Sequence, residues 1–365
     1  MFLRNFKYLW PERFLPEPAW ADPFDTDPPL TPDGPLGVLL VNLGTPDEPT
    51  APAIRRYLAE FLSDPRVIEI PRYLWLPILH GMVLRRRPAR LAPRYADIWM
   101  EGGSPLLVYT QRQAAAVQDV LRGRGLSVRV EAAMRYGNPS IADTIAALRR
   151  EGCDRFLTVP LYPQYSASTT ATVIDQVGRV AATLRNQPEL RFLKRFHVDP
   201  GYIGALAHSI QSYWDANGRA QKLLMSFHGL PRYSIELGDP YYRDCLQTAR
   251  ALRERLGLRE DEVEVSFQSR FGAARWLEPY TEPTLKELAR LGVTEVDVVC
   301  PGFTADCIET LEEIAQEGRD AFLEAGGKRL RYLPALNDDP AWISALSDMV
   351  QTQLQGWPGS TSRAL

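Results

Sequence analysis

The sequence predicts an α/β protein of two domains, each a parallel four-stranded sheet flanked by helices, with a cleft between them. Three observations support this fold class. Short apolar runs typical of buried parallel strands alternate with segments of helical periodicity. The alternation starts again near residue 221, so that about four β/α units precede about four more. The length of 365 residues suits two domains of ordinary size.

The first domain is expected at residues 36–200. A proline-rich arm at 1–35 precedes it, with eight prolines between residues 11 and 35. The domain opens with an apolar strand at 37–43, a turn with Gly44 and Pro46, and a helix at about 50–62. Further strands are expected at 127–134, 155–160 and 191–197, and further helices at 105–122, 139–151 and 168–185.

The second domain is expected at residues 201–355, followed by a short tail at 356–365. Its strands are expected at 222–227, 262–268, 295–300 and 328–333, and its helices at 241–256, 282–291, 307–324 and 340–355. Ligands of such folds bind at the carboxyl ends of the strands. The turns that follow residues 43 and 227 should therefore face one cleft.

Composition excludes several classes of function. Lys and Arg number 42 against 45 Asp and Glu, so no strongly basic surface is implied and nucleic acid is not expected as a partner. Four cysteines are too few for a disulfide scaffold and fit a reducing, cytoplasmic compartment. The Gly-rich phosphate-binding motifs, C-x-x-C, H-E-x-x-H and G-x-S-x-G are all missing from the sequence.

An apolar stretch at residues 73–84 is too short to span a bilayer and is interrupted by Pro77 and Gly81. Three arginines follow it at 85–87. One interpretation is a buried hairpin or short helix. The other is an apolar lip with a basic collar, which touches a membrane surface or admits an apolar ligand.

His228 ends an apolar strand and is followed by Gly229 and Pro231, which permit a sharp turn that presents its side chain to the cleft. The alternative is a turn histidine bonded to nearby backbone. The other three histidines are weaker candidates.

An acidic helix follows the strand that ends at Cys300. Glu309, Glu313 and Glu317 are spaced four residues apart, so a regular helix would align them on one face. Asp306 and Glu309 also fit a capping box. The row is either a solvated face or a path for cations and protons.

Two further segments place polar groups after strands. Tyr165 lies in a Tyr- and hydroxyl-rich segment at 161–170, which can cap a helix or contact a planar anionic ligand. Arg135 and Tyr136 lie at another strand end, where Arg can bind a carboxylate.

Together these segments resemble the ferrochelatase family, whose members insert ferrous iron into a porphyrin to make haem. The matching segments are VNLGTP (41–46), GGSP (102–105), RYGNP (135–139), LYPQYSASTT (161–170), SFHGLPRYSIELGDPY (226–241), FQSRFGAARWL (267–277) and CPGFTADCIETLEEI (300–314). Their joint occurrence in this order, over roughly residues 36–350, is far more specific than any one of them. The resemblance implies two Rossmann-like domains around a porphyrin cleft, a chelatase-like architecture.

The resemblance also implies roles for individual residues. His228 and Glu309 fall on the family's catalytic pair, which also meets the metal, and Glu313, Glu317 and Asp306 fall on its acidic path for protons or metal. The apolar lip falls at about 62–87. The positions implied to contact the porphyrin are Leu43, Arg87, Ser104, Arg135, Tyr136, Tyr165, Trp276 and Phe303.

The implied reaction inserts Fe²⁺ into protoporphyrin IX and releases two protons, with no permanently bound cofactor. Some members hold a [2Fe–2S] cluster, but Ala167 replaces the internal cysteine and no cysteine follows Cys307, so no cluster is expected. Cys307 also replaces a second histidine of other members.

Two alternatives stay open at this point. A non-catalytic porphyrin or haem carrier could use the same cleft, although the set of His228 and acidic residues argues against it. A related chelatase could take cobalt with a more polar tetrapyrrole, or coproporphyrin. Members of the coproporphyrin type carry Tyr at the position of Leu43, so Leu43 and the apolar stretch favour protoporphyrin. The apolar lip extends the cytoplasmic expectation to peripheral contact with a membrane surface.

Overall fold

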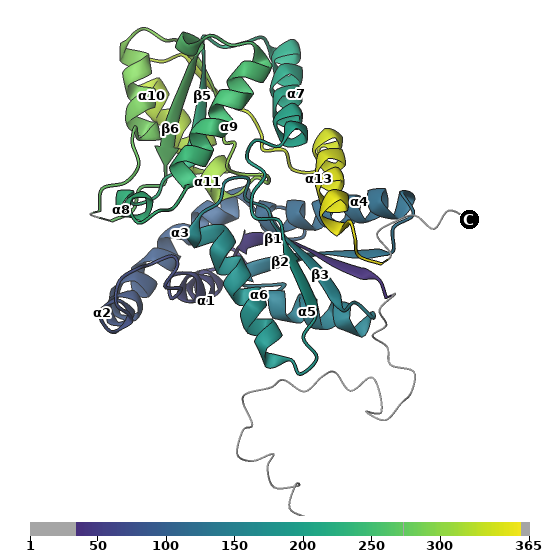
Figure 1. The fold of residues 1–365 in the computed structure, drawn as a ribbon. Helices are drawn as coiled ribbons and strands as arrows, with labels where there is room; N and C mark the ends of the chain where they lie inside the picture. Colours follow the sequence, from purple (N-terminus) through teal and green to yellow (C-terminus); the bar gives the residue numbers. More distant parts are fainter. Residues whose placement is uncertain (1–33, 273, 359–365) are drawn as a thin grey trace, which may run out of the picture.

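The computed structural model describes residues 34–272 and 274–358, and these form two parallel sheets with helices on both faces (Figure 1). The expected arm up to residue 33 and the tail from residue 359 lie outside the described residues. The predicted fold class is confirmed. The domain boundaries given above stay a prediction.

The first sheet has the strand order β2-β1-β3-β4, with every neighbouring pair parallel. The strand β1 is buried on both faces, which explains why its sequence begins with a continuous apolar run. Gly44 ends that strand at φ +120°, and a Cβ there would lie 1.8 Å from the carbonyl oxygen of Tyr136, so only glycine fits. The elements are β1 (Leu36–Gly44), α4 (Pro105–Gly123), β2 (Val128–Tyr136), α5 (Ile141–Arg150), β3 (Arg155–Pro160), η3 (Ala167–Ala171), α6 (Thr172–Thr183) and β4 (Glu189–Phe192).

The second sheet repeats this topology in the order β6-β5-β7-β8, again entirely parallel. Its elements are β5 (Lys222–His228), α8 (Arg232–Glu236), α9 (Tyr241–Leu256), η4 (Glu260–Glu262), β6 (Val263–Gln268), α10 (Thr281–Arg290), β7 (Glu295–Val299), α11 (Ile308–Leu311), η5 (Glu313–Gly318), α12 (Arg319–Glu324) and β8 (Arg329–Tyr332). The carboxyl end of β5 carries His228, as the sequence predicted.

Two helices join the sheets. The helix α7 (Pro200–Asn217) leads into the second sheet, and α13 (Pro340–Leu354) returns to pack on α4 and α7 (Figure 1). Trp342 of α13 stacks on Phe196 at 5.7 Å between ring centroids. Gln113 of α4 donates to the carbonyl oxygens of Thr304 (3.0 Å) and Asn337 (2.6 Å). One core cluster therefore contains residues of both halves of the chain.

The ends of the described chain meet at the amino edge of the first sheet. Arg155, the first residue of β3, donates one hydrogen bond to the carbonyl oxygen of Gly34 (2.9 Å) and another to that of Pro358 (2.8 Å). The indole of Trp357 lies against the guanidinium of Arg191, 3.9 Å from it. Gly34 and Pro358 thus lie at the edge of the sheet opposite the carboxyl ends of its strands.

The segment between β1 and α4 is helical, and comprises α1 (Ala51–Phe61), α2 (Arg72–Ile78), η2 (Leu79–Val83) and α3 (Leu84–Ile98). Trp75 is buried and donates its indole N–H to the carbonyl oxygen of Leu62 at 2.6 Å. The neighbouring apolar side chains point outward, and those that are exposed are Ile70, Tyr73, Leu74, Ile78 and Met82. The helical form and the exposed apolar surface of this segment agree with the lip interpretation. Across the described ranges no helix is both long and apolar enough to cross a bilayer.

Two predicted elements differ from the structure, and one helix was not predicted. The strand expected at 191–197 is instead β4 (Glu189–Phe192), whose pairing with β3 ends at Thr158 and Phe192. The long helix α7 was missed, although Asp199 caps it and Pro200 is its first residue. The helix expected at 307–324 is divided into α11, the π-helix η5 and α12. This last difference changes the geometry of the acidic row.

Candidate functional site

His228 ends β5, and its side chain is partly exposed. Its Nδ1 lies 2.6 Å from the carbonyl oxygen of Gly229. A carbonyl oxygen only accepts, so Nδ1 carries the proton and Nε2 carries the lone pair of a neutral ring. The predicted turn therefore presents a nitrogen that can accept a proton or bind a metal.

Two aromatic rings flank this imidazole. The ring centroids of Trp276 and Phe303 lie 6.4 Å and 6.5 Å from that of His228. Gly229 makes the arrangement possible, because a Cβ there would lie 2.7 Å from the carbonyl oxygen of Gln268 and 3.0 Å from the Trp276 ring. The indole N–H of Trp276 is buried without a hydrogen-bond partner among the described residues. An unsatisfied donor at this place is free for a ligand.

Glu309 lies in the first turn of α11, one residue past the start of the helix. The expected capping box of Asp306 with Glu309 is wrong by one residue, because Cys307 is the N-cap and its backbone N–H donates to Oγ1 of Thr310 at 3.0 Å. Glu309 is therefore not used as a cap. Burial raises the pKa of the Cys307 thiol, and the charge of Glu309 raises it further. Cys307 is thus a buried thiol, without the metal-binding chemistry of an imidazole.

The charge of Glu309 acts on three buried phenols that come from the first half of the chain. Burial raises the pKa of each phenol, and the charge of Glu309 raises each one further; they are Tyr57, Tyr95 and Tyr162. The hydroxyl of Tyr162 is buried without a partner in the part of the chain that the structure describes. The charge of a residue from the second half of the chain thus reaches buried phenols of the first half.

Glu313 is held by Ser269, which the sequence did not single out. The backbone N–H of Ser269 donates to Oε1 of Glu313 at 2.6 Å, and its hydroxyl donates to Oε2 at 2.5 Å. Ser269 adopts φ 64°, a conformation that costs a serine free energy and that directs both donors to one carboxylate. Burial raises the pKa of Glu313 above its ordinary value, while the Ser269 hydrogen bonds and the nearby His228 oppose the shift.

The acidic row does not lie on one helical face. The π-helix η5 inserts an i to i+5 hydrogen bond, from the N–H of Glu317 to the carbonyl oxygen of Glu312 at 3.0 Å. Glu317 consequently lies beside Glu312, and both carboxylates bind Arg94 of α3, at 2.8 Å and 3.0 Å. The expectation that Glu317 continues the face of Glu309 and Glu313 assumed a regular α-helix, and it is corrected here.

Asp306 lies outside this row and is almost fully buried. Its Oδ1 accepts from the hydroxyls of Thr310 (2.9 Å) and Tyr332 (2.6 Å), and its Oδ2 accepts from Nδ2 of Asn337 (2.7 Å). These partners hold the loop between β7 and α11 against the end of β8. The contacts describe a structural carboxylate, which differs from the expected place on a path.

The pKa of Glu312 is raised to about 7, by burial first and then by the charge of Glu317, against the opposing charge of Arg94. A carboxyl whose folded pKa lies above its ordinary value of 4.5 stabilises the fold below about pH 4.5 and loses that contribution as pH rises through about 7. The loss is at most about 3 kcal/mol. Glu312→Gln is therefore expected to resist unfolding better than the natural protein above pH 7, measured by denaturant unfolding from pH 5 to 9.

The exposed Glu287, on α10, offers a matched control for that comparison. Glu287→Gln should follow the natural protein at every pH. If Glu312→Gln also followed it, the carboxyl of Glu312 would titrate near its ordinary pKa.

Arg135 and Tyr136 form a buried cluster. Nη2 of Arg135 lies 2.5 Å from Oδ2 of Asp64, and its Nε donates to Oγ1 of Thr172 at 2.7 Å. The Tyr136 hydroxyl donates to the same Asp64 oxygen at 2.9 Å. Burial raises the pKa of Asp64, but the hydrogen bonds from Thr172, the Arg66 backbone and Tyr136, with the charge of Arg135, bring it below the ordinary value. Arg135 is only 7% exposed, so the expectation that it binds a carboxylate at the mouth is corrected.

Four predicted residues remain, namely Ser104, Tyr165, Leu43 and Arg87. Ser104 is buried and caps α4 by accepting from the N–H of Leu107 at 3.2 Å. Tyr165 is partly exposed, under the ammonium of Lys194 at 4.7 Å from the ring centroid. Leu43 is the only residue of β1 that is not fully buried. Arg87 is partly exposed, and its guanidinium lies 4.7 Å from the centroid of the Phe271 ring. Leu43 and Arg87 thus join His228 and Glu309 at the accessible surface of the site.

Arg87 also faces Glu309. Burial lowers the pKa of Arg87, and the charge of Glu309 opposes this shift. Sequence reasoning missed Arg94, Glu312, Ser269 and Asp64. A signal for Arg94 was present, since it follows Arg87 by seven residues and thus repeats on one helix face. No sequence signal marked Ser269 or Asp64, because their partners are distant in the chain.

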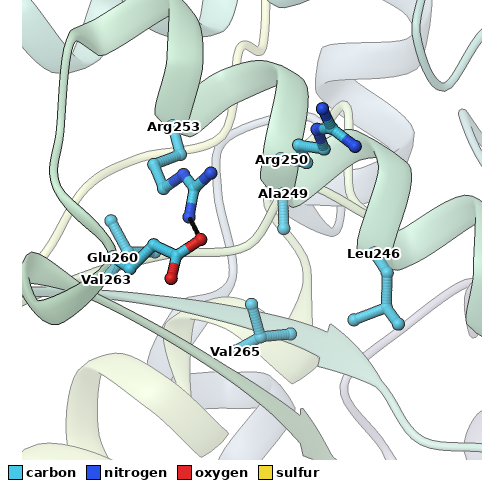
Figure 2. A pocket seen from close by; sticks show the side chains of 7 residues that line it. All are labelled: Leu246, Ala249, Arg250, Arg253, Glu260, Val263 and Val265. Carbon is cyan, nitrogen blue, oxygen red and sulfur yellow. Dashed lines mark hydrogen bonds and ion pairs between the residues drawn. The ribbon is translucent and has the colours of Figure 1, made fainter.

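A pocket of about 470 Å³ lies between α9 and the edge strand β6, away from these residues (Figure 2). Its lining comprises Leu246, Ala249, Arg250, Arg253, Glu260, Val263 and Val265. Arg253 donates to Glu260 at 2.8 Å across it. Paired charges and small apolar side chains leave this pocket without catalytic groups.

Comparisons with known proteins show which proteins this chain resembles. Residues 35–354 match the family model described as ferrochelatase. The chain is 73% identical over 358 residues to the ferrochelatase of Bordetella pertussis strain Tohama I, covering 98% of this chain and 99% of the relative. It is 60% identical to the ferrochelatase of Methylibium petroleiphilum strain PM1, covering 89% and 90%. The solved structure of SirB from Bacillus subtilis with Fe³⁺ is 16% identical with a TM-score of 0.51, covers 88% of this chain and 96% of that one, and shows a similar fold.

Proposed function

The chain belongs to the ferrochelatase family, and we propose from this membership and the site geometry that it inserts Fe²⁺ into protoporphyrin IX to form protohaem. The chain is thus an enzyme, a porphyrin metal lyase of haem biosynthesis. One observation carries the proposal for the site. The imidazole of His228 is flanked by the rings of Trp276 and Phe303, and it is near enough to the Glu313 carboxyl of η5 to oppose the rise of its pKa.

Metal insertion must remove two pyrrole protons and the water shell of the ion. Nε2 of His228 accepts one pyrrole proton and, after passing it on, the second; when it is unprotonated, its lone pair can bind Fe²⁺. Glu309 supplies a second ligand, a carboxylate oxygen. Glu313 receives each proton next, because burial raises its pKa and it lies near His228.

The ring itself is held by the surrounding side chains. Trp276, Phe303 and Leu43 provide apolar contacts, and the indole N–H of Trp276 is a free donor. A porphyrin bound in a bent form exposes its nitrogen lone pairs, so binding energy is used to approach the transition state. Arg87 replaces Arg135 as the cation that meets a propionate, because Arg135 is already paired.

We further propose that the protein holds no permanent cofactor and works in the cytoplasm in contact with a membrane surface. Ala167 stands where cluster-bearing members have a cysteine, and all four cysteines are buried thiols. The exposed apolar side chains at 70–82 lie beside Arg85 and Arg86, a combination suited to a lipid headgroup boundary. The purified protein should show no visible absorbance from an iron–sulfur cluster.

The most informative test is competition between protoporphyrin and coproporphyrin in an insertion assay, with Zn²⁺ as a fluorescent-product substitute for iron. The kcat/KM for protoporphyrin is expected to exceed that for coproporphyrin by at least about tenfold, which corresponds to about 1.4 kcal/mol from the apolar contacts. Leu43→Tyr should narrow this ratio, and Leu43→Ile is the matched apolar control. A preference for coproporphyrin would overturn the substrate assignment, and binding without insertion would indicate a carrier.

A further inference from the structure

Arg94 connects the lip helix α3 to the acidic segment of the second half of the chain. Its Nη1 lies 3.0 Å from Glu312 Oε1, and its Nη2 lies 2.8 Å from Glu317 Oε1. Each of the two terminal nitrogens of the guanidinium thus pairs with a different carboxylate. The pairing joins residues that are more than two hundred positions apart in the sequence.

The two carboxylates meet only because of the π-helix. In a regular α-helix, residues five positions apart point about 140° away from each other, at 3.6 residues per turn. The i to i+5 hydrogen bond between Glu312 and Glu317 removes this separation. Two like charges side by side repel each other unless a cation lies between them. Arg94 is placed to supply that cation.

The paired acids differ from those that face His228. Glu313 binds Ser269 and lies near His228, whereas Glu312 and Glu317 turn toward α3. We propose that Arg94 is a positioning residue, which holds Glu312 and Glu317 together in the π-helix so that, of these four glutamates, only Glu309 and Glu313 are directed to the reaction site. This inference rests on the proposed function, since it assigns a role within metal insertion.

The prediction is tested with Arg94→Gln, which removes the charge, and Arg94→Lys, which keeps it. Steady-state insertion of Zn²⁺ gives KM for the metal and kcat, and fluorescence quenching gives the Kd of protoporphyrin. For Arg94→Gln we expect kcat/KM for the metal to fall about tenfold, the effect of about 1.4 kcal/mol. The porphyrin Kd should stay within about twofold, and Arg94→Lys should recover most of the loss.

Arg90 provides a matched control, because it is exposed on α3 about one turn before Arg94. Arg90→Gln should behave as the natural protein. The double variant Arg94→Gln/Glu317→Gln should regain part of the lost activity, because removing one of two repelling charges replaces the role of the cation. If Glu317 itself delivered the metal, the double variant would instead be worse than Arg94→Gln.

The outcomes separate this inference from the proposed function. If the natural protein inserts Zn²⁺ and Arg94→Gln retains its metal kcat/KM, the positioning role is wrong while the enzyme assignment stands. An equal loss in thermal stability and activity for Arg94→Gln and Arg94→Lys would indicate a purely structural contact. If the natural protein inserts no metal into either porphyrin, the proposed function fails first.

Discussion

Replacing His228 with alanine is expected to abolish metal insertion while porphyrin binding persists. The variant removes Nε2, the ring nitrogen that is left free when Nδ1 binds the carbonyl oxygen of Gly229, at the end of β5 and near Glu313. Loss of a positioned general base alone lowers turnover by about 10²–10⁴-fold, and loss of a metal ligand at the same atom adds to it. Insertion of Zn²⁺ by the purified variant, with fluorescence quenching as the measure of bound porphyrin, gives both quantities.

His208 offers a control for this variant. It is exposed and lies in α7, whereas the acidic segment lies in α11 and η5. His208→Ala should retain full turnover. Near-normal turnover of His228→Ala would show that another group accepts the pyrrole protons, and a parallel loss of porphyrin binding would show that His228 holds the ring.

Asp64→Asn is expected to destabilise the protein by about 3–5 kcal/mol, because it leaves the buried Arg135 guanidinium without its counter-charge. Asp64 also accepts from the hydroxyls of Tyr136 and Thr172, so the carboxylate is the centre of a buried network. Denaturant unfolding at constant pH measures the change. The structural role that this result would establish is the reason why Arg135 is not assigned to the propionates.

An exposed ion pair on the same domain provides the comparison. Arg66 and Asp175 lie 2.8 Å apart near the surface, so Asp175→Asn should cost less than about 1 kcal/mol. Arg135→Lys adds a readout of function, since lysine cannot reproduce the guanidinium contacts. It should lower stability without changing porphyrin affinity. If stability were unchanged and porphyrin binding were tenfold weaker, Arg135 would be a substrate-binding residue after all.

The repeated α/β order could be predicted because buried parallel strands leave continuous apolar runs that are separated by amphipathic helices. The strand at 155–160 and the helix at 241–256 agree with the structure to the residue. Of the helices between β1 and α4, the first was predicted, whereas the segment at 70–82 exposes several of its apolar side chains and so lacks the pattern of a helix with one buried face. Residues 191–197 were misread because strand length depends on the neighbour in the sheet, which periodicity does not reveal.

The site divides along similar lines. His228 was identifiable because a strand end and a glycine turn are local features. Glu317 was placed on the wrong side, because the spacing of the Glu residues does not reveal the π-helix η5, in which Glu317 pairs with Arg94. The burial of Arg135 likewise depends on its pairing with Asp64, which the position of Asp64 in a loop does not predict. The class of reaction could thus be predicted from the sequence. Which charged residues lie at the site, and which are paired elsewhere, could be seen only in the fold.

The clamp that Arg155 makes on the carbonyl oxygens of Gly34 and Pro358 has a practical consequence. Both ends of the described chain emerge together at the amino edge of the first sheet, whereas the site occupies the carboxyl edges of the strands. A carrier protein joined at Gly34 or at Pro358 would therefore be attached on the side of the first sheet away from the site. The proximity of these two residues also suits a circular permutation in which a short linker joins Pro358 to Gly34.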